Sequence, residues 1–365
     1  MIMAHKKKKI ALIGYRLSGG GSDKVMANLS IFFQHQGFEV DIIIVLDEVG
    51  FPYLGKLVNL GLLKNKINGI FNKARRLLAL RKYLNENEFD FIIDFRFRTK
   101  IVQELILARL IYNTKTIFTV HSFLIDHYMP NNSWLTRLMY NHCFANVAIT
   151  DEMKTLIESK HQLQNVVTIH NPVYLEEIVK KQNEKIYLEF DFIIAIGQYE
   201  NEIKQFDKLI SAYAQSDLSQ KQIHFVIIGN GDESKLKKVI LENNISGFVH
   251  LLGYQNNPFK YLSKAKFLVL SSKNEGFPNV ILEALACKTP VVSFDCDFGP
   301  RDMITNLENG ILVENQNWNK LTEAMDLLIS DAVLYQHCKE NTLESIQPFL
   351  LEKIGQEWLY LLKAD

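Results

Sequence analysis

Residues 267–283 read Phe-Leu-Val-Leu-Ser-Ser-Lys-Asn-Glu-Gly-Phe-Pro-Asn-Val-Ile-Leu-Glu, and this stretch decides the fold. The apolar run 267–271 predicts a buried strand. Residues 280–286 favour a helix, because they are good helix formers and no breaker follows until Thr289-Pro290. The loop between them therefore lies at the carboxyl end of a parallel strand, the edge at which open α/β sheets bind their ligands.

The loop in this stretch has the residues of an anion-binding turn. Gly276 allows a ligand to approach the backbone, and Pro278-Asn279 starts the helix, so free N–H groups face an anion. Glu275 on the loop and Glu283 on the helix would repel a phosphate unless they bind something else, and sugar hydroxyls are natural partners. The alternative is a solvated surface loop with two ordinary glutamates.

Length and charge exclude several classes of protein. The chain has 365 residues, which indicates two or more domains with ample core. Its 41 basic residues are balanced by 41 acidic ones, so no basic surplus exists to neutralise a nucleic-acid backbone. An aromatic content of 11% is typical of a packed enzyme and not of a disordered chain. We expect no nucleic-acid partner.

Cysteine usage and hydropathy indicate the compartment. The four cysteines contain no C-x-x-C pair, so they favour a reducing cytosol over a disulfide framework or a zinc site. No stretch of about 18 apolar residues could span a membrane. Lys6–Lys9 precede the first strand, either as a solvated tail or as a contact with an anionic membrane surface. We expect a cytoplasmic protein, with peripheral attachment to the inner face of the cell membrane as the open alternative.

Strands and helices alternate in the same way in both halves of the chain. In the first half, a strand at 10–14 is followed by the glycine loop 19–22 and an amphipathic helix at about 23–36. In the second half, a strand at 192–197 is followed by a polar loop and a helix at about 206–214. Short strands alternating with helices predict parallel sheets. We therefore expect an α/β protein of two Rossmann-like domains whose sheets face each other across a cleft.

The predicted boundary lies where Pro172 stops a strand and a charged linker follows. We expect an N-terminal Rossmann-like domain at 1–175 and a C-terminal Rossmann-like domain at 176–345. A closing amphipathic helix at 346–365 crosses back toward the first domain. Residues 50–84 are harder to interpret: 75–81 are helical, and the part before them reads as an insertion.

At this point the residues resemble the retaining glycosyltransferases of family 4, also called group 1, which have the GT-B fold. The resemblance is strongest over 192–312 and rests on Glu275-x7-Glu283 in its Gly-Phe-Pro-Asn setting. Further matches are the turn 229–232, Leu-Gly-Tyr at 252–254 and Thr-Pro-Val-Val-Ser at 289–293. The first half matches more loosely, through the glycine loop and Thr-Val-His-Ser at 119–122.

The resemblance implies transfer of a sugar without a metal, from a nucleotide sugar bound by the domain at 176–345 to an acceptor bound by the domain at 1–175. Breaking the bond to the diphosphate requires that its charge be stabilised, by a metal or by fixed cations and N–H dipoles. Similar enzymes use the second option. The candidates here are Lys204, the backbone of Phe277, Pro278, Asn279 and Val280, and the loop at Gly20 and Gly21. We therefore expect no metal and no cofactor, only a UDP-sugar as donor substrate.

Three further roles follow from the resemblance. Glu283 matches the glutamate that accepts hydrogen bonds from the ribose hydroxyls, and Glu275 the one beside the donor sugar. His121 matches the histidine of the N-terminal domain that positions the donor sugar. A histidine after a strand is also commonly structural, and that alternative stays open.

One departure from the family pattern concerns the diphosphate. Relatives usually carry an Arg and a Lys that bind it together, but here neutral Gln198 replaces the Arg while Lys204 remains. Losing a bidentate guanidinium removes on the order of 1.5–3 kcal/mol of charge-assisted bonding. Arg301 and Lys208 are the candidates to compensate. Asp295-Cys-Asp297 looks like a metal motif of another fold, but we interpret it as a structural loop.

Donor and acceptor are predicted only as classes. The run 295–302 resembles bacterial members that build surface polysaccharides from UDP-hexoses. We therefore expect a UDP-linked hexose or N-acetylhexosamine as donor and a growing glycan as acceptor, with a lipid-linked glycan as an open alternative. Five arginines of the first half could meet a lipid pyrophosphate, or be ordinary solvated charge: Arg75, Arg76, Arg81, Arg96 and Arg98. Two alternatives remain: a catalytically silent subunit that supports a partner glycosyltransferase, and a UDP-sugar 2-epimerase.

Overall fold

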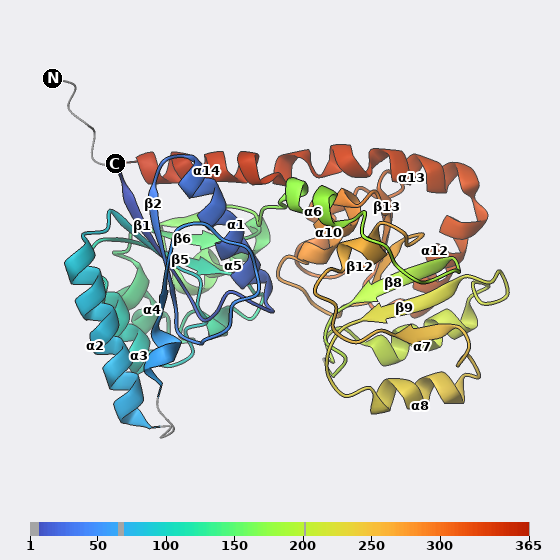
Figure 1. Cartoon of the computed structure of the whole chain (residues 1–365), viewed down its shortest axis with the longest axis horizontal. Coiled ribbons are helices and arrows are strands. Elements are labelled where there is room, and N and C mark those ends of the chain that lie inside the picture. The colour runs from blue at the N-terminus through green and yellow to red at the C-terminus, as the bar shows by residue number, and fades with distance from the viewer. Residues whose placement is uncertain (1–6, 65–68, 201, 365) are drawn as a thin grey trace. The chain divides into compact units, whose positions relative to one another are not determined.

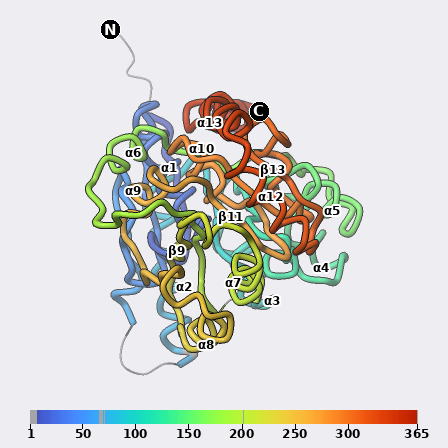
Figure 2. Tube along the Cα trace, turned by 90° about the vertical axis from the view of Figure 1, so that its right-hand side faces the viewer, coloured from blue at the N-terminus to red at the C-terminus, as the bar shows by residue number. Residues whose placement is uncertain are grey.

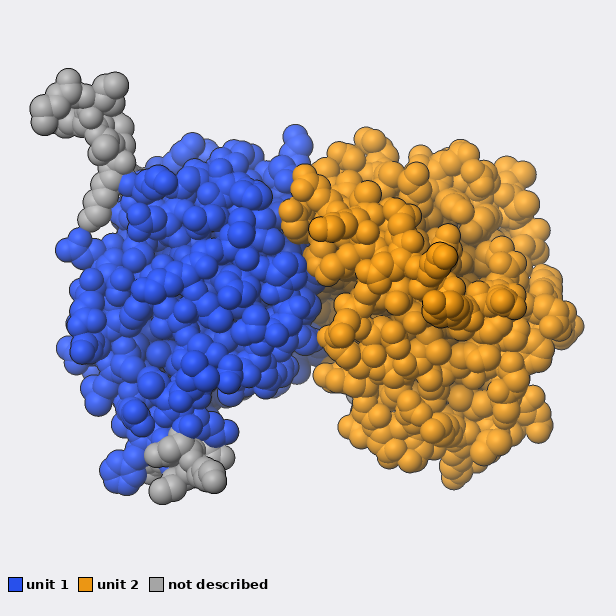
Figure 3. Space-filling view, in the orientation of Figure 1, with its two compact units in different colours: residues 1–172, 351–365 blue, residues 173–350 orange. Residues whose placement is uncertain are grey.

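The computed structural model describes residues 7–64, 69–200 and 202–364 (Figure 1). The chain divides into two compact units, which Figure 3 distinguishes by colour. Unit 1 comprises residues 1–172 and 351–365, and unit 2 comprises residues 173–350. The chain therefore passes from one unit to the other twice.

Unit 1 is built on a seven-stranded sheet in the order β3-β2-β1-β4-β5-β6-β7, with every neighbouring pair parallel. Because β2 and β4 lie on opposite sides of β1, the strand order reverses there, and ligands of open α/β sheets bind at such a point. The strands are β1 (Lys9–Gly14), β2 (Glu39–Ile44), β3 (Lys56–Asn59), β4 (Phe91–Asp94), β5 (Lys115–Val120), β6 (Ala145–Ala148) and β7 (Val166–Thr168).

Helices and single turns connect these strands. They are α1 (Gly21–His35), η1 (Leu60–Leu63), α2 (Ile70–Asn87), α3 (Ile101–Ile106), η2 (Leu107–Ile111), η3 (Ile125–His127), α4 (Ser133–Tyr140), α5 (Asp151–His161) and the late helix α14 (Leu351–Lys363). The central strands are almost continuously apolar and buried, as parallel strands covered on both faces must be.

Unit 2 is built on a six-stranded parallel sheet in the order β10-β9-β8-β11-β12-β13. Its strand order reverses between β8 and β11, so the loops that follow these two strands are neighbours. The strands are β8 (Phe192–Ile196), β9 (His224–Ile228), β10 (Val249–Leu251), β11 (Leu268–Leu270), β12 (Val291–Asp295) and β13 (Gly310–Glu314).

The helices of unit 2 cover this sheet, and α7 and α8 pack side by side (Figure 2). They are α6 (Leu175–Lys181), α7 (Phe206–Gln215), α8 (Ser234–Glu242), α9 (Phe259–Leu262), α10 (Asn279–Ala286), α11 (Pro300–Met303), α12 (Trp318–Ser330) and α13 (Ala332–Ser345), with the short turn η4 (Gln347–Phe349). The expectation of two parallel-sheet α/β domains is thereby confirmed.

Two segments differ from the sequence-based expectation. Residues 50–84, which read as an insertion, contribute the edge strand β3, the turn η1 and most of α2. The strand was missed because its four residues, Lys56–Asn59, are only partly buried and carry no alternating pattern. Residues 65–68 of this segment, and Lys6 of the basic run 6–9, lie outside the described residues.

Helix α14 completes unit 1 by packing on α1. The rings of Phe33 and Trp358 meet edge to face at 6.5 Å. Gly355 fits against the ring of Phe32 so closely that a Cβ on it would lie 2.4 Å from two ring carbons. The absence of a side chain at position 355 therefore sets how closely the two helices approach.

Replacing Gly355 with Ala tests this contact. Helix propensity alone favours Ala by about 1 kcal/mol, whereas overpacking a core costs about 1–3 kcal/mol. We expect a net loss of stability, measured as a lower urea midpoint of unit 1. The same substitution at Gly247, which has nothing within 4 Å, serves as the control. A Gly355→Ala variant as stable as the parent would contradict the packing argument.

Candidate active site

The loops after β8 and β11 in unit 2 are bonded to each other. Ser271 Oγ donates to the carbonyl of Lys204 at 2.6 Å, and Gln205 Nε2 donates to the carbonyl of Ser271 at 3.1 Å. The backbone N–H of Lys273 donates to the carbonyl of Ile203 at 2.8 Å. These three bonds hold the residues just before α7 against the end of β11, and so place Lys204 beside the loop that carries Glu275.

Lys204 and Glu275 form an ion pair at this point. The distance from Lys204 Nζ to Glu275 Oε1 is 2.5 Å, and the two side chains are only 18% and 14% exposed. The stem of the lysine lies on the backbone of Gly197, where a Cβ would approach Lys204 Cγ to 3.1 Å. The structure thus brings together two residues that the sequence singled out separately, 71 positions apart.

The turns that follow β8, β9 and β10 form a closely packed wall next to this pair. A Cβ on Gly229 would lie 1.8 Å from the carbonyl oxygen of Gly197, so only glycine fits there. Tyr199 Oη donates to the carbonyl of Ile227 at 3.1 Å and accepts from the N–H of Gly253 at 3.0 Å. Sequence reasoning quoted the glycine turn but missed Tyr199, which ties the three turns together.

The turn before α10 has a fixed shape. Pro278 is the residue that precedes the first turn of the helix, and Asn279 begins it. Phe277 is buried, and its ring contacts that of Phe349 at 5.8 Å. Gly299 has a φ of +90° and packs so closely that a Cβ would lie 2.6 Å from Pro278 Cδ. The backbone N–H groups at the start of α10 are therefore presented by a rigid loop.

The other residues predicted for this turn lie in the loop and on the first two turns of α10. Gly276 is buried in the loop, while Asn279 and Val280 are half-buried on the first turn of α10. Glu283 is half-buried on the second turn of the same helix. One rigid strand–loop–helix segment therefore carries both glutamates of the E-x7-E motif.

The two cations predicted to compensate for Gln198 are already bonded. Arg301 Nε lies 2.9 Å from Asp295 Oδ1, so one carboxylate of the Asp-Cys-Asp run is its ion-pair partner. Lys208 Nζ donates to Gln205 Oε1 at 3.0 Å and lies over the ring of Trp318. Gln198 itself is exposed. Of the cations singled out near this turn, Lys204 is the one that contacts Glu275.

In unit 1, His121 follows β5 and is kept uncharged by its surroundings. Its ring stacks on Phe95 with centroids 5.6 Å apart. Both ring nitrogens are buried, and among the described residues neither has a partner with hydrogen-bond geometry. Burial, and secondly the charge of Arg98, lower the pKa of His121 to about 3, while the nearby Asn171 side chain acts weakly in the opposite direction. A neutral imidazole can position a sugar hydroxyl but adds no positive charge.

The glycine loop of unit 1 already holds a carboxylate. Gly20 precedes α1 and Gly21 is its first residue. A Cβ on Gly20 would lie 2.9 Å from Asp23 Oδ2, so the loop closes on the Asp23 carboxyl group. Burial raises the pKa of Asp23 to about 6 against the opposing effect of Arg16, which also bonds Glu48 at 2.8 Å. Sequence reasoning missed Asp23 and Arg16, and an anion at this loop must compete with Asp23.

Two of the five arginines proposed to meet a lipid pyrophosphate, or to be ordinary solvated charge, are buried, so the second interpretation is wrong for them. Arg98 is 1% exposed, and its guanidinium donates to three backbone carbonyls, including those of Tyr128 and Thr119. Arg96 is bonded to Asp94 at 2.7 Å and to Glu104 at 2.9 Å. A charge in the interior needs such partners, and both arginines find them within the fold.

The fold and this arrangement of residues define a class of protein. Two parallel-sheet units, with a Lys–Glu pair beside a turn that starts a helix at the switch point of the second, are those expected of a GT-B glycosyltransferase. Residues 176–345 match the family model of glycosyl transferases group 1, and residues 19–177 match that of glycosyltransferase family 4. Together the two models span most of the chain, which therefore belongs to the group 1 glycosyltransferases.

Similar proteins support this assignment over the full length. The N-acetylgalactosamine-N,N'-diacetylbacillosaminyl-diphospho-undecaprenol 4-alpha-N-acetylgalactosaminyltransferase of Campylobacter jejuni is 29% identical, over 97% of this chain and 100% of the relative. An uncharacterized glycosyltransferase of Haemophilus influenzae is 26% identical, over 94% of this chain and 97% of the relative.

Solved structures show the same fold. A mutant of TarM from S. aureus, in complex with Fondaparinux, alpha-GlcNAc-glycerol and UDP, has a TM-score of 0.77 at 18% identity, covering 98% of this chain and 100% of that one. HepE from Anabaena, in complex with UDP and glucose, has a TM-score of 0.78 at 17% identity with the same coverage.

None of the described helices combines the length and the apolar character needed to cross a bilayer.

The state of His121 yields a prediction about pH. Because its pKa is about 3 in the folded chain against the usual 6.5, the unfolded chain binds the proton more readily below pH 6.5. Stability should therefore fall as pH drops from 6.5 toward 3, by up to about 1.4 kcal/mol per pH unit from this group. The measure is the pH slope of urea unfolding, compared with a His121→Gln variant. A ring at position 121 that titrates between pH 5 and 8 by NMR would contradict this prediction.

Proposed function

We propose that this chain is a retaining glycosyltransferase that moves a hexose or N-acetylhexosamine from a UDP-sugar to a growing surface glycan in its lipid-linked form. The observation that carries the proposal is the Lys204–Glu275 pair beside the anion-binding turn of unit 2. A lysine and the backbone N–H groups of a helix start suit a diphosphate, and carboxylates suit the hydroxyls of ribose and hexose.

The names of similar proteins support the donor and acceptor classes. UDP is bound in the TarM and HepE complexes. The Campylobacter jejuni relative transfers N-acetylgalactosamine to a diphospho-undecaprenol-linked sugar, according to its name. A second relative, from Staphylococcus aureus, is a poly(ribitol-phosphate) alpha-N-acetylglucosaminyltransferase and is 29% identical over 60% of this chain. These names favour a UDP-linked donor and a cell-envelope glycan as acceptor.

The reaction breaks the bond between the anomeric carbon and the diphosphate, so negative charge develops on the departing UDP. Lys204 and the backbone N–H groups from Phe277 to Val280 would stabilise that charge, and fixed dipoles of this kind cost little reorganisation during the reaction. Glu283 would accept hydrogen bonds from the ribose. We propose that these groups suffice without a metal ion, and that His121 and the loop at Gly20–Gly21 contribute from unit 1.

The Lys204–Glu275 pair also suggests how donor binding prepares the site. While the lysine is bonded to Glu275, its charge is neutralised, and the carboxylate is not available for sugar hydroxyls. A donor diphosphate competes with Glu275 for the ammonium group. Its arrival would release the carboxylate beside the sugar. One exchange of partners would therefore leave Lys204 bound to the diphosphate and Glu275 available for the sugar hydroxyls.

The acceptor class suggests where the enzyme works. A lipid-linked glycan lies at a membrane surface, so we propose a cytoplasmic enzyme that attaches peripherally to the inner face of the cell membrane. A silent partner subunit is the competing possibility, and its support is specific: Gln198 is neutral, and Arg301 and Lys208 are each bonded elsewhere.

The decisive experiment incubates the purified chain with a panel of UDP-sugars and short lipid-linked acceptors, with and without EDTA. We expect UDP release and a product whose new linkage keeps the anomeric configuration of the donor, by NMR, with EDTA having no effect. A 2-epimerised sugar, or binding without turnover, would identify an epimerase or a silent subunit instead. Loss of activity in EDTA that Mg²⁺ restores would overturn metal independence.

The partner exchange predicts opposite effects for its two members. Glu275→Gln should bind UDP about 10-fold more tightly, because no carboxylate competes for Lys204, yet lose kcat. Lys204→Ala should lower kcat by about 10²-fold or more and weaken UDP binding. In the double variant the gain from Glu275→Gln should vanish.

Titration calorimetry with UDP alone measures these affinities. Glu242→Gln is the control, since Glu242 pairs with Lys238 on the exposed face of α8 in the same unit. Unchanged or weaker UDP binding by Glu275→Gln would rule the exchange out.

A further inference from the structure

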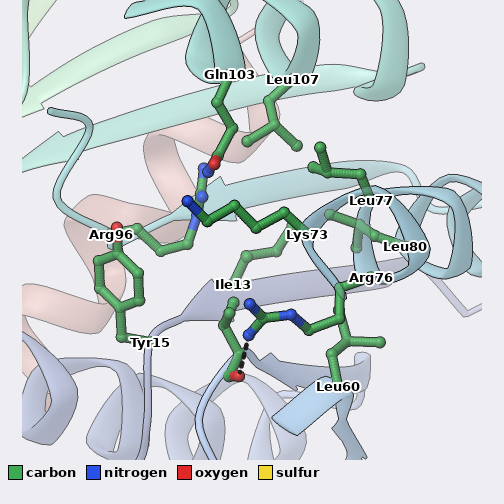
Figure 4. A pocket seen from close by; sticks show the side chains of 11 residues that line it. Ile13, Tyr15, Leu60, Lys73, Arg76, Leu77, Leu80, Arg96, Gln103 and Leu107 are labelled. Carbon is green, nitrogen blue, oxygen red and sulfur yellow. Dashed lines mark hydrogen bonds between the residues drawn. The ribbon is translucent and has the colours of Figure 1, made fainter. Parts of the chain in front are cut away.

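Unit 1 contains a cavity that the proposed donor site does not use (Figure 4). Its volume is about 60 Å³, several times the roughly 10–15 Å³ that one water needs. Ile13 of β1, Val45 just after β2 and Arg96 just after β4 line its base, and α2 covers it. The cavity thus lies at the carboxyl ends of the strands around the point where strand order reverses, a usual place for ligands.

The charged part of the lining of this cavity is cationic. Lys73, Arg76 and Arg96 contribute their side chains, and no acidic residue is among the residues described as its lining. Arg96 is neutralised by Asp94 and Glu104, whereas Arg76 donates to the backbone carbonyl of Val45 at 3.1 Å and pairs with no carboxylate among the described residues. Figure 4 shows the Lys73 side chain running across the cavity toward Arg96.

A further cation lies next to Lys73. Lys100 lies so close that side-chain hydrogen bonding to it, and secondly its charge, lower the pKa of Lys73, and the charge of Arg76 adds a smaller effect in the same direction. Like charges that converge on one space repel each other, and an anion that occupies this space would relieve the repulsion. Three cations without a carboxylate partner among these contacts would match the charge of a phosphate or diphosphate group.

Apart from Tyr15 and Gln103, the rest of the lining is apolar. Leu77 and Leu80 of α2, with Leu60 and Leu107 from neighbouring turns, face the same space. Small-molecule sites commonly combine apolar walls with a few polar groups that orient the ligand. A free inorganic anion would gain nothing from these leucines, whereas an anion attached to a hydrocarbon would.

The outward face of α2 is distinct from the cavity. Phe71, Arg75, Leu78 and Lys82 follow one another at helical spacing, and Phe71 and Leu78 are 90% and 66% exposed. From Lys56 to Asn85 the chain has eight basic residues and no acidic one, although the whole chain is neutral. This outward stripe provides a matched comparison for the cavity residues on the same helix.

We propose that this cavity binds the phosphate group of an apolar phosphate or diphosphate ester, with Lys73 and Arg76 as its cations, Lys100 beside them and the leucines against the first carbons of the chain. The identification of this ester as the lipid end of the acceptor rests on the proposed function. The binding itself does not, because it involves unit 1 alone.

Farnesyl diphosphate, a short water-soluble ester of this class, is the probe. Titration calorimetry should show binding of farnesyl diphosphate at least 10-fold tighter than that of inorganic diphosphate or farnesol. Lys73→Gln and Arg76→Gln should each weaken it about 10-fold, while Arg75→Gln and Lys82→Gln on the outward stripe should leave it unchanged. Thermal unfolding confirms that each variant is folded, and the exposed Lys73 gives a readout even if Arg76→Gln destabilises the fold.

Several outcomes would overturn the inference. Equal affinity for inorganic diphosphate would mean a plain anion site. Equal losses of farnesyl diphosphate affinity in the cavity variants and the stripe variants would mean adsorption to a membrane surface. The same conclusion would follow if vesicles containing anionic lipid displaced farnesyl diphosphate only when the stripe is intact. Calorimetry with UDP distinguishes this proposal from the proposed function. The cavity variants should bind UDP as the parent chain does. If the parent chain itself fails to bind UDP or to turn over a UDP-sugar, that result counts against the proposed function alone.

Discussion

The ion pair between Lys204 and Glu275 depends on the strand order of the unit 2 sheet and on the hydrogen bonds between two of its loops. Both residues lie on loops, and loops hold a charge in place only when their backbones are bonded. Ser271, Gln205 and Lys273 supply those bonds between the end of β11 and the residues before α7. The reversal of strand order between β8 and β11 makes the two loops neighbours in the first place. Sheet topology is therefore what brings opposite charges from distant parts of the chain into contact.

The elements that follow from local pattern were predictable from the sequence. Apolar runs of four to six residues predicted the strands β1, β8, β9 and β11, and the E-x7-E segment predicted the loop and helix that carry both glutamates. The partner of Glu275 was not predictable, since nothing local to Lys204 says which loop it meets. The same holds for Tyr199, whose hydroxyl joins three turns that come together only in the folded sheet.

Charged residues were the hardest to interpret, because burial decides their role and burial is a property of the whole fold. The five arginines of the first half looked alike in sequence, yet Arg98 is sealed among carbonyls and aromatic rings while Arg75 is exposed on α2. Asp23 gave no signal, although its carboxyl group sits in the glycine loop. A neutral overall charge also concealed an acid-free segment of thirty residues around α2.

The placement of α14 has a consequence for biosynthesis. This helix belongs to unit 1, but the ribosome makes it only after all of unit 2. Until then, the surface of α1 around Phe32 and Phe33 has no cover, because Gly355 and Trp358 are its partners. Unit 2 can therefore finish folding first, and the nascent first unit exposes an apolar patch on α1 until the last helix is made.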